Sequence, residues 1–79
     1  MTYIATFHTH FGAMNFLRTM KKDKIIAEMM PVPRVLSASC GVCVKFNADD
    51  IILEELTSVD LEGVYKIVEN EYQLVKKFD

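Results

Sequence analysis

The segment Pro31–Phe46 constrains the fold of this chain most strongly, because it holds both prolines, both cysteines and one of the three glycines. Pro31 and Pro33 have no backbone N–H to donate to a sheet, so a preceding strand is expected to stop there. A loop then continues to Ser39, and the alternating residues Gly41–Phe46 predict a new strand. Both cysteines therefore fall at the start of this strand.

The N-terminal part predicts a strand, a helix and a second strand. Residues Tyr3–Phe7 are apolar and favour a buried strand. Thr9 can cap a helix, because its hydroxyl can accept a free N–H of the first turn. Apolar residues then recur at helical spacing within His10–Lys22. Residues Ile25–Met30 predict a second strand that ends at Pro31.

A second helix and further strands are predicted after the cysteines. Asn47 is suited to cap a helix that ends by Ser58, and Gly63 marks the turn that follows. Residues Val64–Glu69 alternate as expected of a fourth strand. Residues Tyr72–Phe78 either pair with it as a hairpin or form a frayed helix at the C-terminus.

This order of elements predicts an α+β fold in a single domain, residues 1–79. The expected architecture is a ferredoxin-like two-layer sandwich (βαββαβ): an antiparallel sheet with two helices on one face and an optional extra C-terminal strand. In that topology the third strand lies antiparallel to the first. The loop around Cys40 is then expected beside His8, Thr9 and His10, at the start of the first helix.

Composition excludes several classes of function. The chain has nine basic and eleven acidic residues, interspersed, which gives a net charge of −2 and no basic surface for nucleic acid. It has no apolar run of about 18 residues that could cross a membrane, and its N-terminus lacks the features of a signal peptide. We therefore expect a cytoplasmic domain with free thiols. The hydrophobic share of 51% favours self-association into a homo-oligomer.

Cys40 is the candidate for chemistry. A thiolate is the reactive form of cysteine, and a helix N-terminus or a nearby cation lowers the pKa that governs it. The predicted topology supplies the helix end. The predicted surroundings of the thiol are His8, His10, Arg34, Ser37, Ser39 and Gly41. The alternative interpretation is a small residue that only fills the core.

Cys43 completes a Cys-x-x-Cys spacing with Cys40, which is typical of a redox pair or of half a zinc site. The predicted strand opposes both, because residues three apart on a strand point to opposite faces. No second cysteine pair completes a zinc site. His8 and His10 are better interpreted as loop residues that modulate a thiol than as metal ligands. We therefore expect neither a metal nor a cofactor.

Two parts of the sequence, Phe7–Ala13 and Met30–Gly41, together with the pair Lys45-Phe46, resemble a family of small bacterial proteins described as selenium/sulfur carrier-like. The resemblance implies that Cys40 carries sulfur or selenium as a persulfide or selenosulfide. A cysteine desulfurase-type protein would be the donor and a second protein the acceptor. The positions that match the family's cysteine and its surroundings are Pro33, Arg34, Ser37, Cys40 and Gly41. Cys43 departs from the family's small apolar residue and is either neutral or a resolving thiol.

Three hypotheses follow. The leading one is a thiol-based carrier, a binding protein rather than a turnover enzyme. The second is a non-catalytic regulatory or oligomerisation module, since this fold does not fix function. The third is a soft-metal chaperone that uses Cys40 and Cys43, which requires the two thiols to converge.

Overall fold

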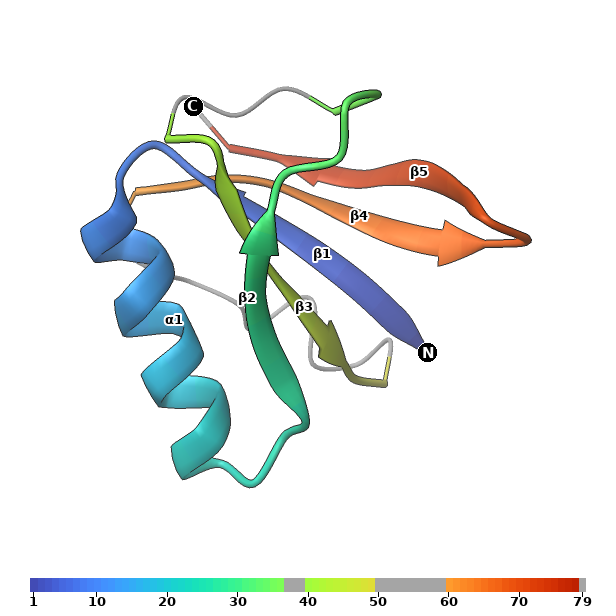
Figure 1. Cartoon of the computed structure of the whole chain (residues 1–79). Coiled ribbons are helices and arrows are strands. Elements are labelled where there is room, and N and C mark those ends of the chain that lie inside the picture. The colour runs from blue at the N-terminus through green and yellow to red at the C-terminus, as the bar shows by residue number, and fades with distance from the viewer. Residues whose placement is uncertain (37–39, 50–59, 79) are drawn as a thin grey trace.

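One helix and five strands form the described part of the computed structural model, residues 1–36, 40–49 and 60–78 (Figure 1). The strands make one antiparallel sheet in the order β2-β3-β1-β4-β5. Helix α1 packs against β1, β2 and β3 on one face of this sheet. The elements are β1 (Thr2–Phe7), α1 (His10–Lys22), β2 (Ala27–Pro31), β3 (Val42–Asn47), β4 (Leu61–Val68) and β5 (Glu71–Lys77).

The predicted α+β class is confirmed, but the described residues do not form the two-helix ferredoxin-like pattern. Most of the predicted second helix falls on residues 50–59, outside the described residues. Asn47, predicted as its cap, is instead the last residue of β3. It pairs with Thr2, and its N–H donates to the Ile26 carbonyl at 3.0 Å. Because neighbours on both sides supply partners, the strand extends through Asn47.

Helix α1 begins and ends where the sequence predicts. The Thr9 hydroxyl accepts a hydrogen bond from the Gly12 N–H at 3.0 Å. Lys21 and Lys22 lie in the last turn, where cations suit the negative end of the helix dipole. The buried face of the helix consists of Gly12, Ala13, Phe16 and Met20.

Four aromatic rings join α1 to the sheet. Phe16 of α1 contacts Phe7 and Phe46, with ring centroids 5.2 and 5.3 Å apart. Tyr3 stacks on Phe46 at 5.7 Å. Such pairs contribute about 0.5–1.5 kcal/mol each beyond the burial of their area. Phe7, the last residue of β1, is thereby fixed at the end of the sheet where Cys40 lies.

The hairpin of β4 and β5 selects between the two predictions for the C-terminus, since β5 is a strand. Glu69 and Asn70 connect the strands, and their φ angles of 51° and 67° are those of a type I′ turn. The prediction of a turn at Gly63 is wrong, because Gly63 lies inside β4, opposite Thr6. The pairing with β1 shifts just beyond this position, so β4 begins earlier, at Leu61.

Strand β2 starts at Ala27 rather than Ile25 and includes Pro31. Pro31 is tolerated because β2 is an edge strand, where a missing N–H costs no ladder hydrogen bond. Val32 continues the pairing by donating to the Gly41 carbonyl at 3.0 Å. No helix within residues 1–36, 40–49 and 60–78 has the length and apolar character to cross a membrane.

Candidate functional site

The Cys40 thiol lies at the end of β1, just before β3 begins. Its Sγ is 3.2 Å from the Phe7 carbonyl oxygen and 3.5 Å from the Val42 carbonyl oxygen, so the S–H is placed to donate to these acceptors. The side chain is partly buried and packs against the core on the α1 side of the sheet. Cys40 is therefore held by backbone groups and keeps part of its surface open to solvent.

Gly41 allows the chain to turn from Cys40 into β3. Its φ of +76° lies in the left-handed region that residues with a Cβ avoid. A Cβ added at Gly41 would meet nothing within 4 Å. The need for glycine at this position is therefore conformational rather than steric.

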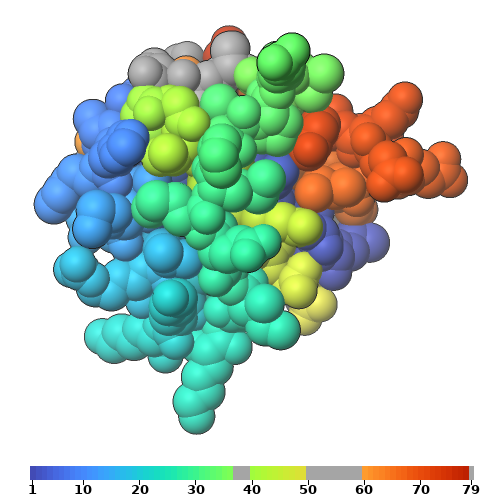
Figure 2. Space-filling view, viewed as in Figure 1, coloured from blue at the N-terminus to red at the C-terminus, as the bar shows by residue number. Residues whose placement is uncertain are grey.

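His10 connects the start of α1 to Cys40. Its Nε2 lies 3.2 Å from the Cys40 carbonyl oxygen, and its side chain is exposed. In Figure 1 the N-terminal end of α1 lies beside the start of β3, and Figure 2 shows the two segments adjoining on the surface. The predicted closeness of the Cys40 loop to the strand–helix junction is present in the structure.

His8 extends toward β4. The ring Nδ1 of His8 is 4.0 Å from the Glu62 Oε1. The backbone N–H of His8 donates to the Asp60 carbonyl at 2.8 Å. The two histidines thus have different neighbours: His10 contacts the Cys40 backbone, and His8 contacts Glu62.

An acidic residue shares the N-terminus of α1. The Thr9 hydroxyl donates to the Asp60 Oδ2 at 2.7 Å while it accepts from Gly12. A carboxylate at this position is stabilised by the positive end of the helix dipole. Asp60 therefore places a negative charge at that positive end. Sequence reasoning missed this residue because only the pairing of β1 with β4 brings it to Thr9.

Arg34 lies in a turn in which the Leu36 N–H donates to the Pro33 carbonyl at 3.0 Å. Its side chain is exposed, and within the described residues no hydrogen bond or ion pair joins it to Cys40. The predicted neighbours Ser37 and Ser39 lie outside the described residues.

Cys43 is fully buried on the sheet face away from α1. It pairs with Thr6 of β1 and Met30 of β2, and its Sγ is 3.8 Å from the Pro31 carbonyl oxygen. Burial raises the pKa of the Cys43 thiol from 9.0 to about 11, and a negative charge on Cys40 adds to this increase. Cys43 therefore remains a protonated thiol at neutral pH. Both cysteines are free.

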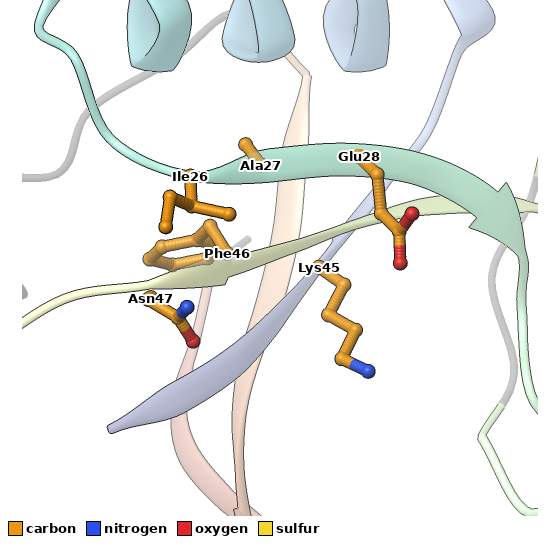
Figure 3. A pocket seen from close by; sticks show the side chains of 6 residues that line it. All are labelled: Ile26, Ala27, Glu28, Lys45, Phe46 and Asn47. Atoms are coloured by element: carbon orange, nitrogen blue, oxygen red, sulfur yellow. The ribbon is translucent and has the colours of Figure 1, made fainter.

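A shallow hollow of about 300 Å³ lies over β2 and β3 at the end opposite Cys40 (Figure 3). Its lining residues are Ile26, Ala27, Glu28, Lys45, Phe46 and Asn47. In the described part of the chain, no group of three or more histidine, cysteine or acidic side chains is arranged to hold a metal ion.

Fold and site define a small α+β domain that presents one partly open cysteine where its first strand, its helix and its third strand meet. A family model described as "Putative Se/S carrier protein-like" matches residues 2–77, so the chain belongs to that family. The resemblance found in the sequence is thereby confirmed. No curated protein and no solved structure matches the chain.

Proposed function

We propose that this protein carries sulfur or selenium on Cys40 between a donor and an acceptor protein. The observation that carries the proposal is the contrast between the two thiols of a chain in this family. Cys40 is partly open at the junction of β1, α1 and β3, whereas Cys43 is sealed inside the molecule. A carrier needs one accessible sulfur and a docking surface rather than a deep pocket.

The proposed transfer is a thiol–persulfide exchange. The Cys40 thiolate attacks the outer sulfur of a persulfide on a cysteine desulfurase-type donor, and the S–S bond of the donor breaks. The donor cysteine leaves as a thiolate, and Cys40 becomes a persulfide. The acceptor's thiolate then attacks the outer sulfur of Cys40, which returns to a thiol. One S–S bond forms for each that breaks, so no external oxidant or reductant is consumed.

The neighbouring groups support this exchange in different ways. The Phe7 and Val42 carbonyls accept the S–H of resting Cys40, so the sulfur must lose its proton and leave these acceptors to react. His10 is a positioning residue, because it contacts the Cys40 backbone and not the sulfur. Arg34, which is exposed on the preceding turn, is proposed to contact the anionic persulfide, because the family resemblance puts it among the surroundings of the cysteine.

The test is the intact mass of the protein after incubation with a cysteine desulfurase and cysteine. The wild type and Cys43→Ser are expected to gain the mass of one sulfur atom, and Cys40→Ser is expected to gain none. Thiol-specific reduction should remove the added sulfur. An adduct that persists in Cys40→Ser, or no adduct on any variant, would contradict the proposal.

Edge strand β5 favours a second candidate function, a self-associating module. Leu74 and Val75 are 57% and 41% exposed on this strand, whose outer edge has no partner strand in the described sheet. An open edge is a template for pairing with a second copy. Sedimentation at increasing concentration tests this, and a Val75→Pro variant should lower the dimer fraction. A monomer at all concentrations would exclude it.

A further inference from the structure

The exposed face of α1 starts beside Cys40 with two large apolar side chains. Phe11 and Met14 are 64% and 53% exposed. They follow His10, whose ring contacts the Cys40 backbone. Since residues three or four apart share one side of a helix, Met14 lies one turn along from His10 on the same side. The apolar pair is therefore next to the strand–helix junction that holds the thiol.

Cations continue this face toward the other end of α1. Arg18 lies four residues after Met14, and Lys21 and Lys22 follow one turn later, all exposed. No ion pair neutralises these three side chains within the described residues. The face consists of Phe11, Met14, Arg18, Lys21 and Lys22, and we call it the α1 face.

The charge of the α1 face is opposite to that of the chain as a whole. The net charge is −2, yet four of the nine basic residues and only one of the eleven acidic residues lie within residues 18–24. A concentration of positive charge on an acidic protein attracts partners with a negative surface and speeds their encounter. The apolar pair next to Cys40 supplies the part of such an interface that is buried.

We propose that the α1 face docks the sulfur donor, a protein whose persulfide-bearing cysteine is flanked by an apolar contact and an acidic surface. This inference rests on the proposed carrier function. Phe11 and Met14 would be buried nearest the reacting sulfurs, and the cations would pair with carboxylates farther along the helix. The transfer step is the exchange written above.

An anionic membrane is the competing partner for a basic, apolar helix face. A helix that lies in a membrane interface buries an apolar side along its length, with cations flanking it. On α1 the apolar pair occupies one end and the cations the other, with the thiol beyond the apolar end. This order fits a protein that must reach Cys40 better than a lipid surface.

The experiment measures the rate at which the source organism's own cysteine desulfurase, charged with cysteine, loads the carrier with sulfur. Two double variants alter the α1 face: Phe11→Ser with Met14→Ser, and Lys21→Glu with Lys22→Glu. The matched controls are Ile26→Ser, 76% exposed at the far end of the sheet, and Lys77→Glu on β5. We expect roughly tenfold slower loading for each double variant, with the wild-type rate falling as salt rises, and unchanged controls.

Glutathione persulfide loads Cys40 without docking and separates the two proposals. If it fails to load wild-type Cys40, the carrier function fails and the docking inference fails with it. If glutathione persulfide loads every variant equally and the desulfurase also loads every variant at the wild-type rate, only the docking inference is overturned. Binding to phosphatidylserine vesicles that the Lys21→Glu/Lys22→Glu variant loses, with no change in desulfurase loading, would also overturn it.

Discussion

Cys40 and Cys43 face opposite sides of the sheet although only two residues separate them. Cys40 packs on the α1 side, and Cys43 pairs with Thr6 and Met30 on the other side. A disulfide requires Cβ atoms about 3.5–4.5 Å apart and directed toward each other. The pair therefore cannot close without remodelling the start of β3. This geometry opposes a resolving role for Cys43 and a metal site shared by the two thiols.

The two thiols should react very differently with an alkylating probe. At pH 7.5 iodoacetamide is expected to modify Cys40 and leave Cys43 unmodified in the folded protein, because Cys43 is buried and its pKa is raised to about 11. Peptide mass mapping after a timed quench measures this. The denatured protein, in which both cysteines react, is the control. Equal labelling of both cysteines in the native state would contradict the sheet geometry.

Alkaline pH should destabilise the protein through Cys43. The folded pKa of about 11 exceeds the ordinary value of 9.0, so the unfolded chain releases this proton first as pH rises. The protonated Cys43 thiol therefore stabilises the fold by at most about 3 kcal/mol of unfolding free energy. This contribution is complete below about pH 8 and is lost as the pH rises from 9 to 11.

Urea unfolding of the wild type and of Cys43→Ala at pH 7.5 and pH 10.5 measures that contribution. Other groups that titrate in this range cancel in the difference between the two proteins. The wild type is expected to lose more stability than the variant on going to the higher pH. Equal losses in both proteins would show that burial of Cys43 does not control its ionisation.

Gly41→Ala should destabilise the turn that positions Cys40. Placing a residue with a Cβ at a φ of +76° lowers the free energy of unfolding by about 1–2 kcal/mol. The added Cβ would meet no atom within 4 Å, so no steric clash is expected in addition. Gly41→Asn is the matched comparison, since asparagine tolerates the left-handed region, and it should lose clearly less stability. Urea midpoints of the three proteins provide the measurement. A similar loss for alanine and asparagine would indicate a steric cause instead.

The first half of the fold was predictable because its signals are local. The helical spacing of apolar residues and the Thr9 cap define α1, and an alternating segment defines β3 to within one residue. The assignments that were wrong depend on partners distant in sequence. Asn47 is a good helix cap in isolation, yet it forms strand pairs with neighbours from two other segments. Gly63 resembles a turn residue until its pairing opposite Thr6 is known.

The candidate site was predictable only where topology determined it. Placing the third strand beside the first was enough to bring Cys40 near His10. The Phe7 carbonyl and the Asp60 carboxylate were not predictable, because backbone acceptors leave no trace in side-chain identity and Asp60 reaches Thr9 through the pairing of β4. Arg34 was expected near the thiol from the predicted topology and from the family resemblance, but its side chain is exposed on the turn after Pro33.

Asp60→Asn should make Cys40 more reactive. Asp60 places a negative charge at the N-terminus of α1, where the Thr9 hydroxyl donates to its Oδ2 at 2.7 Å. Asparagine keeps an oxygen for that bond and tolerates the left-handed φ of 60°, so the fold should be retained while the charge is removed. The positive end of the helix dipole is then left for a thiolate at Cys40. We expect Cys40 alkylation at pH 7.5 to become roughly two- to fivefold faster, a change that corresponds to about 0.4–1 kcal/mol of electrostatic free energy.

Glu62→Gln is the control for this experiment, because it removes one negative charge from the neighbouring strand position, where the carboxylate contacts His8 rather than the helix end. It should leave the Cys40 rate nearly unchanged. Rates measured at low and at high salt separate a through-space charge effect, which salt screens, from a change in structure. An unchanged rate in Asp60→Asn, or an equal increase in Glu62→Gln, would mean that the shared helix N-terminus does not govern the reactivity of Cys40.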